Sequence, residues 1–176
     1  MTESYLYGEQ IYLRAIEEKD IALLTAFNNE KNSRILADDD VPYPTSSKDL
    51  ETFMAENELG KNFAICRQAD QQLIGSLAIY AVDYQNLHCQ LGITLSGQYQ
   101  GKGYGREAMN LIIHFIFMYL PINKIKLQVF SFNFKAIHLY KQLGFKHEGT
   151  LKEEIFRFAA FQDLESYALF RKDWQQ

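Results

Sequence analysis

The sequence predicts an α+β fold built on one mixed, mostly antiparallel sheet. Short apolar runs separated by brief turns, as in 62–67 and 73–83, are typical of antiparallel hairpins. One long apolar segment, 106–119, lies between the strand-like runs 88–95 and 124–130 and predicts a strand–helix–strand crossover. Hairpins joined to a single crossover give a mixed sheet rather than a fully parallel one.

The first part of the chain predicts one strand and two helices around an acidic loop. Asp20 can cap the first helix, whose apolar residues share one face, and Thr45 to Ser47 offer caps for the second. Pro42 and Pro44 interrupt the chain between them. In order, we predict a strand at 11–16, a helix from 20 to about 32, an acidic loop at 38–40, and a helix that ends near 58.

The remaining chain predicts a sheet with two further helices. The helix at 106–119 is apolar nearly all round, so we expect it to be buried on both sides. A shorter helix follows Asn133, which suits an N-cap, and Gly144 suits the left-handed residue after its end. The predicted strands are 62–67, 73–83, 88–95, 124–130, 145–151, 154–158 and 164–170.

A glycine-rich loop, Gln100-Gly101-Lys102-Gly103-Tyr104-Gly105-Arg106, precedes the long helix. Glycine permits positive φ and close approach of a ligand, and a loop before a helix directs N–H groups at phosphate. The spacing fits neither the P-loop pattern nor the dinucleotide fingerprint, whose third glycine comes one residue later. The loop therefore predicts a phosphorylated cofactor other than ATP or NAD, and the alternative is an ordinary flexible turn.

The segment from Asn133 to Phe145 is the second informative motif. Its apolar residues Ala136, Leu139, Tyr140 and Leu143 follow the i, i+3, i+4, i+7 rule. Taken alone, the segment indicates an amphipathic helix with Tyr140 as a core aromatic residue.

Together, Q-G-K-G-x-G and N-x-x-A-x-x-x-Y-x-x-x-G-F resemble the GNAT superfamily of acyl-CoA-dependent N-acetyltransferases. More narrowly, the chain is similar to the ribosomal-protein and spermidine N-acetyltransferase branch, with further matches at Leu13-Arg14, Leu73-Ile74-Gly75 and Glu148-Gly149-Thr150-Leu151. The resemblance covers most of the chain. It implies one GNAT domain over residues 1–176, with helices on both faces of the sheet.

The resemblance also implies the site. Acetyl-CoA is the expected co-substrate, and its pyrophosphate would lie on the backbone N–H groups of the glycine loop. The side chains of Lys102 and Arg106 either support this field or are solvated surface charges. The implied cofactor-binding residues are Gly92, Ile93, Thr94, Leu95, Gln100, Gly101, Lys102, Gly103, Tyr104, Gly105, Arg106, Asn133, Ala136 and Tyr140.

The expected reaction is direct attack of a neutral primary amine on the thioester. A backbone N–H of Ile93 or Leu95 would stabilise the oxyanion. By resemblance Tyr140, which is neutral at pH 7, would protonate the departing thiolate as the catalytic acid.

Two positions depart from the pattern of relatives. Many relatives carry a glutamate on the strand before the loop, whereas this chain has Gln90 nearby, so the base is a water relay or one of Glu148, Glu153 and Glu154. The last hairpin lacks its turn glycine at 158–163, which predicts a less tight turn. Its apolar residues could line the acceptor site, form a homodimer contact, or fold onto the core.

The acceptor stays open. Asp38, Asp39 and Asp40 lie in the segment that walls the acceptor cleft in this family, and three carboxylates would attract a cationic amine such as a polyamine. The alternatives are a peptide N-terminus or an aminosugar, for which an aromatic wall would consist of Tyr43, Tyr80, Tyr84 and Phe156. A non-catalytic acyl-CoA-binding protein is a further alternative.

Composition excludes several other classes. The net charge of −4 disfavours nucleic-acid binding, and the longest apolar run, 111–120, is too short to span a bilayer. Cys66 and Cys89 lie far apart in strand-like runs and predict buried thiols, and the histidines show no metal-ligand spacing. With a polar N-terminus, these features lead us to expect a cytoplasmic enzyme without a metal.

Overall fold

The computed structural model describes residues 6–38 and 40–174. Its strands are β1 (Ile11–Ala15), β2 (Lys61–Arg67), β3 (Leu73–Asp83), β4 (His88–Leu95), β5 (Lys124–Phe130), β6 (Lys146–Arg157) and β7 (Ala160–Phe170). Its α-helices are α1 (Ile21–Asn28), α2 (Lys31–Leu36), α3 (Ser47–Glu56), α4 (Tyr104–Tyr119) and α5 (Phe134–Gln142). The strands form one seven-stranded sheet in the order β1-β2-β3-β4-β5-β7-β6.

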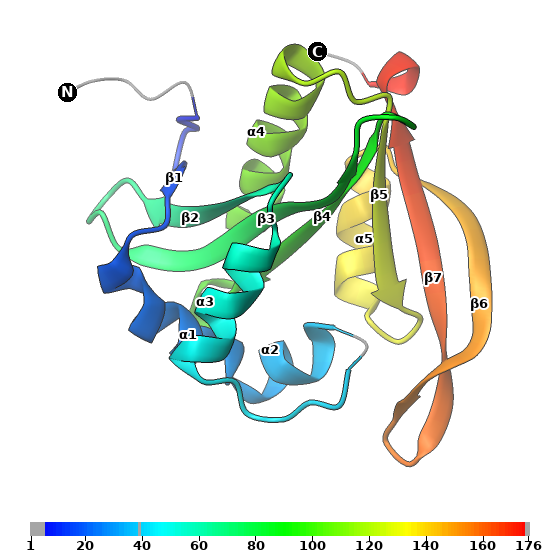
Figure 1. Cartoon of the computed structure of the whole chain (residues 1–176), viewed down its shortest axis with the longest axis horizontal. Coiled ribbons are helices and arrows are strands. Elements are labelled where there is room, and N and C mark those ends of the chain that lie inside the picture. Colours follow the sequence, from blue (N-terminus) through cyan, green and yellow to red (C-terminus); the bar gives the residue numbers. More distant parts are fainter. Residues whose placement is uncertain (1–5, 39, 175–176) are drawn as a thin grey trace.

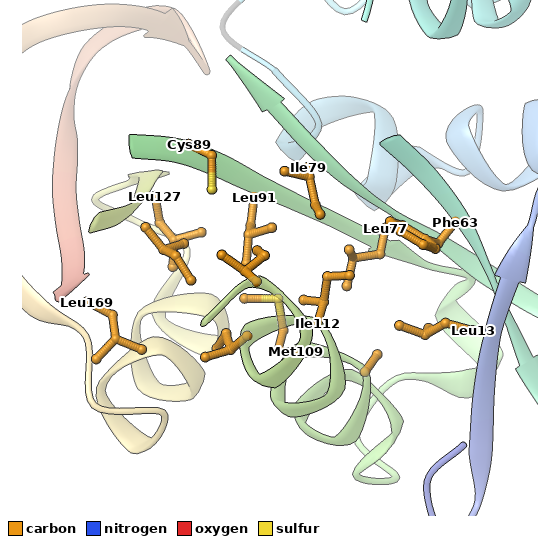
Figure 2. Packing of buried hydrophobic residues seen from close by; sticks show 14 of the residues in the cluster. Leu13, Phe63, Leu77, Ile79, Cys89, Leu91, Met109, Ile112, Leu127 and Leu169 are labelled. Atoms are coloured by element: carbon orange, nitrogen blue, oxygen red, sulfur yellow. The ribbon is translucent and has the colours of Figure 1, made fainter. Parts of the chain in front are cut away.

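Helices cover both faces of this sheet, as predicted (Figure 1). On one face α4 and α5 bury the larger apolar cluster, in which Met109 and Ile112 of α4 meet Leu77 and Leu91 of the sheet (Figure 2). On the other face, Leu24 and Phe27 of α1 and Leu50 of α3 pack over strand residues that include Tyr12, Ala64 and Cys66. The predicted α+β mixed sheet is therefore confirmed.

The sheet opens at the junction of β4 and β5. These are the only parallel neighbours in the described sheet, and their pairing ends after Gln90 opposite Lys126. Beyond that pair the two strands diverge, so the sheet has a V-shaped opening bounded by residues 91–95 of β4 and 127–130 of β5 (Figure 1). The edge of β4 that faces β5 is therefore unpaired along this stretch.

The helix predicted from Asp20 to about Asn32 is wrong at its C-terminal end. α1 ends at Asn28, and α2 begins at Lys31. Glu30 between them has an extended backbone (φ −59°, ψ 137°). Its carboxylate accepts hydrogen bonds from Ser96 Oγ at 2.6 Å and the Gly97 N–H at 2.7 Å. A tertiary contact therefore interrupts a sequence that is locally able to continue as a helix.

The expectation that the long helix is buried on both sides is also wrong. Ala108, Ile112 and Ile116 of α4 are buried against the sheet. The opposite face is exposed, and it consists of Arg106, Asn110, His114 and Met118 at four-residue spacing. α4 packs against a single face of the sheet, so the apolar Met118 contributes to the molecular surface.

The last hairpin corrects two further expectations. Glu153, with φ 53°, lies in a bulge between Leu151 and Ile155, so the two predicted strands 145–151 and 154–158 are one strand, β6. At the tip, Arg157 pairs with Ala160, which leaves a two-residue turn of Phe158 and Ala159 with φ 56° and 57°. Positive φ at both positions is the pattern of a tight hairpin turn. The turn is therefore tight without glycine.

Candidate functional site

Every second backbone group of β4 faces the opening. The N–H of Ser96 donates to the Ile74 carbonyl of β3, so the main chain of the even-numbered residues points toward β3. By strand alternation the N–H groups of Ile93 and Leu95 point toward β5 and the opening. The Leu95 carbonyl on that side accepts a hydrogen bond from Gln100 Nε2 at 2.9 Å. The N–H groups of Ile93 and Leu95, the expected oxyanion donors, thus point into the opening.

The glycine loop directs its backbone N–H groups away from the rest of the protein. None of the six N–H groups from Gly101 to Arg106 donates to another described residue. Gly101 (φ 73°) and Gly103 (φ 88°) adopt the left-handed conformation that favours glycine, and Gly103 is the N-cap of α4. A Cβ at Gly105 would lie 3.3 Å from Leu95 Cδ1, so this glycine lets α4 pack closely on β4.

The loop carries positive charge beside these N–H groups. Lys102 and Arg106 are both exposed, and Lys102 Nζ lies 5.9 Å from the centroid of the Tyr99 ring. Sequence reasoning missed Arg67, whose guanidinium lies over the same ring at 5.3 Å. Asp70 and then Tyr104 raise the pKa of Arg67, so its charge is partly balanced by Asp70. No local motif marks Arg67, because only the pairing of β1, β2 and β3 brings its side chain to the loop.

Tyr140 lies on α5 and is 8% exposed. Burial, and after it the nearby Tyr80, raises the pKa of Tyr140 to about 12. Tyr80 belongs to β3, and a Cβ on Gly92 would lie 3.4 Å from Tyr80 Cε1. Since the Tyr80 ring lies over Gly92, and Tyr80 is close enough to act on Tyr140, the Tyr140 phenol belongs to the region of the opening.

Asn133 caps α5, as predicted. Its side-chain oxygen accepts a hydrogen bond from the Ala136 N–H at 3.3 Å. No described residue binds the amide NH2 group of Asn133, so this group is available to contact a cofactor. Ala136 lies one turn before Tyr140 on the same face, where it packs against the core.

The candidate bases are not gathered around Tyr140. Glu148 lines a recess of about 220 Å³ together with Gln90, but its Oε1 is 2.7 Å from Lys124 Nζ in an ion pair. β5 ends at Phe130, so Glu153 and Glu154 lie in the part of the hairpin that extends beyond it. Of the three glutamates, Glu148 is the one that lines the recess beside Gln90, and its carboxylate is paired.

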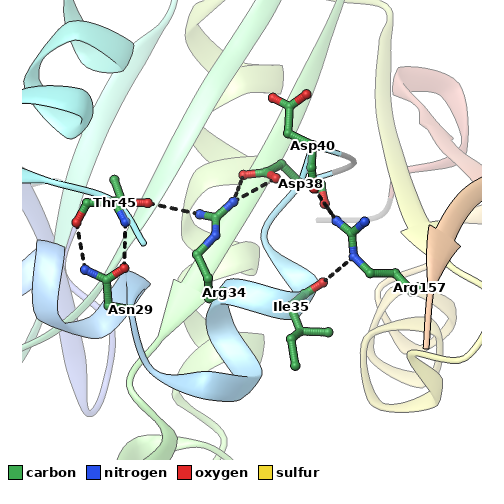
Figure 3. Close-up of polar contacts among 7 residues, drawn as sticks. All are labelled: Asn29, Arg34, Ile35, Asp38, Asp40, Thr45 and Arg157. Atoms are coloured by element: carbon green, nitrogen blue, oxygen red, sulfur yellow. Dashed lines mark hydrogen bonds and ion pairs between the residues drawn. The ribbon is translucent and has the colours of Figure 1, made fainter. Parts of the chain in front are cut away.

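A clasped segment, residues 29–45, contains α2 and most of the acidic loop (Figure 3). Asn29 and Thr45 close it, because Asn29 Nδ2 donates to the Thr45 carbonyl at 2.7 Å and the Thr45 N–H donates to Asn29 Oδ1 at 2.8 Å. Arg34 donates to both carboxylate oxygens of Asp38 at 2.8 and 2.6 Å and to Thr45 Oγ1 at 3.2 Å.

These contacts correct the expectation of three free carboxylates. Asp38 is neutralised by Arg34, and Asp39 lies outside the described residues. The carbonyl of Asp40, like that of Asp38, binds the guanidinium of Arg157. Among the described residues of the acidic loop, the carboxylate of Asp38 is paired with Arg34, whereas Arg157 binds the loop only through backbone carbonyls.

The proposed aromatic wall is not assembled. Tyr80 lies over Gly92 beside the opening, whereas Tyr84 lies in the β3–β4 turn at the paired end of β4. Phe156 lies near the hairpin tip and packs edge-on against Phe161, with ring centroids 5.2 Å apart. These positions are at opposite ends of the opening, so one ligand cannot contact all of these rings.

The comparisons with known proteins agree with this geometry. Residues 10–146 match the family model described as Acetyltransferase (GNAT) domain, and the chain belongs to this family. It is an N-acetyltransferase.

Named relatives and solved structures cover nearly the whole chain. An SPbeta prophage-derived uncharacterized N-acetyltransferase of Bacillus subtilis is 28% identical over 99% of this chain and 98% of its own. Spermidine N(1)-acetyltransferase of Vibrio cholerae is 29% identical over 89% and 91%. A crystal structure of spermidine N-acetyltransferase from Vibrio cholerae in complex with CoA and spermine superimposes with a TM-score of 0.85 at 28% identity, covering 94% of this chain and 98% of that one.

Other features of the described residues bear on the remaining expectations. No helix among them is long and apolar enough to cross a membrane. They contain no group of three or more His, Cys, Asp or Glu side chains that could hold a metal ion. Cys66 and Cys89 are buried free thiols, as predicted, and burial raises the pKa of Cys89 to about 12.

Proposed function

We propose that this N-acetyltransferase moves the acetyl group of acetyl-CoA to a small primary amine, and that the amine is a polyamine. The observation that carries the proposal is the row of six unpaired N–H groups from Gly101 to Arg106 at the start of α4. Such a row, at the positive end of a helix, binds a pyrophosphate in a protein that is acidic overall.

The pantetheine arm would lie in the opening between β4 and β5. There the main-chain groups of Ile93 and the N–H of Leu95 can hydrogen-bond its amides, and one of the two N–H groups can stabilise the oxyanion. Gly92 and the side chain of Thr94 face the opposite surface of the sheet, from which the amine would approach.

Tyr140 would supply the proton of the leaving group. The amine nitrogen bonds to the thioester carbon, the C–S bond breaks, and the thiolate takes the phenolic proton. The pKa of about 12 for Tyr140 exceeds that of a solvated thiol, for which about 8.5 is typical. Burial of the coenzyme A thiol would raise its pKa as well, as burial does for the Cys89 thiol. The pKa values of the phenol and the thiol would then lie closer together, which makes the proton transfer less unfavourable.

The amine must lose a proton, and a water relay is the best-supported acceptor for it. Gln90 cannot act as a base, and the carboxylate of Glu148 is paired with Lys124. Water in the recess beside Gln90, which also borders Ser166, could pass the proton to solvent.

A polyamine is favoured over the other amines by the relatives. Spermidine N-acetyltransferases match along most of this chain, and one of their structures is in complex with spermine. The paired Asp38 reduces the contribution of the acidic loop to this choice, which is why the acceptor has to be tested directly.

The test has two parts. Calorimetry with acetyl-CoA measures the loop's role, and we expect saturable binding. A thiol-release assay then compares spermidine, an aminoglycoside and a peptide with a free N-terminus, and we expect spermidine to be the best acceptor. Absence of acetyl-CoA binding at millimolar concentration would contradict the site, whereas turnover of the peptide alone would contradict only the polyamine.

A further inference from the structure

The clasped segment is held at three places, two of them by residues from other parts of the fold. At its start Glu30 binds Ser96 and Gly97 at the end of β4. Its two ends are joined by the amide contacts of Asn29 with Thr45. Its middle is held by Arg157, which comes from β6 and is 117 to 122 residues away in sequence (Figure 3).

Arg157 binds the backbone of the segment rather than its side chains. Its Nη2 donates to the carbonyl of Asp38 at 3.0 Å and to that of Asp40, and its Nε reaches the Ile35 carbonyl at 3.5 Å. The residue is 7% exposed, and its guanidinium lies 5.5 Å from the centroid of the Phe130 ring. Within the described residues it forms no ion pair with a carboxylate.

This arrangement suits a positioning role. A buried guanidinium must satisfy its N–H groups, and its rigid fork can do so on several carbonyls only when these are correctly placed. Because backbone carbonyls are the acceptors, the contact fixes the backbone at Ile35, Asp38 and Asp40 and leaves the carboxylate of Asp38 to Arg34.

The fixed part of the segment borders the wide end of the sheet opening. Leu36 of α2 packs into a cluster with Phe130 at the end of β5 and with Ile155 and Leu164 of the last hairpin. In Figure 1, α2 and the chain after it lie beyond the diverging ends of β4 and β5. An amine that approached Gly92 and Thr94 from this end of the opening would pass the segment.

We propose that Arg157 positions the clasped segment so that it forms the acceptor side of the active site, and thereby sets the affinity for the amine. This inference rests on the proposed function. Arg157 does not touch the reacting atoms. It acts through the segment, so its loss should affect the amine more than acetyl-CoA.

The structure offers a matched control in Arg171. This arginine also donates to three main-chain carbonyls, those of Phe117, Leu120 and Ile122, and lies 5.3 Å from the centroid of the Phe117 ring. It holds the C-terminal end of α4, where the described contacts do not include the clasped segment. Arg171→Met therefore removes an equivalent set of contacts elsewhere in the fold.

The experiment compares Arg157→Lys, Arg157→Met and Arg171→Met with the full chain. Spermidine kinetics give KM and kcat, calorimetry gives the acetyl-CoA Kd, and hydrogen exchange reports on amides at 35–38 and 40–45. We expect both Arg157 variants to raise the spermidine KM by about tenfold or more. Acetyl-CoA affinity should change by less than about twofold, and exchange in the segment should accelerate. Arg171→Met should change neither KM nor that exchange.

Lysine separates geometry from charge, because it keeps the charge and lacks the fork. A spermidine KM and an exchange rate equal to those of the wild type in Arg157→Lys would overturn the inference. A lower spermidine KM in Arg157→Met would also overturn it, because that result would mean that Arg157 acts only through its positive charge. If the wild-type protein binds acetyl-CoA but does not acetylate spermidine, the proposed acceptor fails. The exchange comparison between Arg157 and Arg171 variants then still decides whether Arg157 orders the segment.

Discussion

Tyr140 is the residue whose surroundings bear most directly on the chemistry. Its phenol is buried on α5, and burial raises its pKa to about 12. A tyrosine with such a pKa is fully protonated at neutral pH and can donate. Placement near the sheet opening, through Tyr80 and Gly92, distinguishes it from an ordinary core aromatic residue.

Tyr140→Phe removes the phenolic proton and keeps the ring. We expect kcat to fall by about a hundredfold, because general acid catalysis is worth roughly that much, while the acetyl-CoA Kd stays nearly unchanged. Steady-state kinetics and calorimetry on the same preparation measure both. Tyr12→Phe is the control, since this buried tyrosine belongs to the β1–β2 pairing, away from the opening. A wild-type kcat in Tyr140→Phe would eliminate the proposed role.

At the scale of elements, the glycine loop and the last hairpin both depend on left-handed backbone. In the loop Gly101 has φ 73°, and a Cβ there would meet no atom within 4 Å. Glycine is therefore favoured at this position by the left-handed backbone conformation and not by a lack of space for a side chain. In the hairpin Phe158 and Ala159 adopt the same region without glycine. The contact between the Phe158 and Phe132 rings, with centroids 5.3 Å apart, helps to hold the tip.

Gly101→Ala should weaken acetyl-CoA binding by about tenfold, because a shifted φ turns the loop N–H groups away from the pyrophosphate. Gly144→Ala is the matched control. Gly144 has φ 89° after α5, and a Cβ there would lie 3.7 Å from Leu169 Cδ1. Both variants should lose about 1 kcal/mol of stability through the strained φ. Equal acetyl-CoA affinity in the two variants, measured by calorimetry, would argue against the loop as the binding site.

Ala159→Gly should stabilise the protein by up to about 1 kcal/mol, since glycine adopts positive φ without the Cβ clash. Urea unfolding followed by circular dichroism measures the change. Ala160→Gly, which places glycine at the paired first residue of β7, should destabilise the protein instead. Destabilisation by Ala159→Gly of the same size would show that the turn does not have the conformation described.

At the scale of the whole molecule, the raised pKa of Tyr140 makes stability depend on alkaline pH. The unfolded phenol ionises near pH 10 and the folded one near 12. Between these values the folded state binds more protons, so its stability is complete below pH 10 and falls as pH rises toward 12. We expect the unfolding midpoint of the wild type to decrease more steeply over this window than that of Tyr140→Phe in parallel thermal melts. Identical slopes would mean that Tyr140 ionises equally easily in both states.

Local sequence was sufficient for most of the elements. The bounds of β3, β4 and β5 follow from alternating apolar residues and turn signals, and the caps at Ser46 and Asn133 follow from side chains that satisfy nearby N–H groups. The glycine loop was equally readable, because left-handed φ at Gly101 and Gly103 is a local demand on the backbone.

Only the tertiary structure decided which charged groups pair and where a tertiary contact interrupts a locally favoured helix. Glu30 interrupts the helix because it binds Ser96 and Gly97. The carboxylate of Asp38 forms an ion pair with Arg34, and Arg157 binds a segment that lies more than a hundred residues earlier in the chain. The amino-acid sequence by itself determined the fold class and the glycine loop, since these depend on neighbours in the chain. The position of the clasped segment depends on contacts between distant parts of the chain, and such contacts exist only once the sheet has formed.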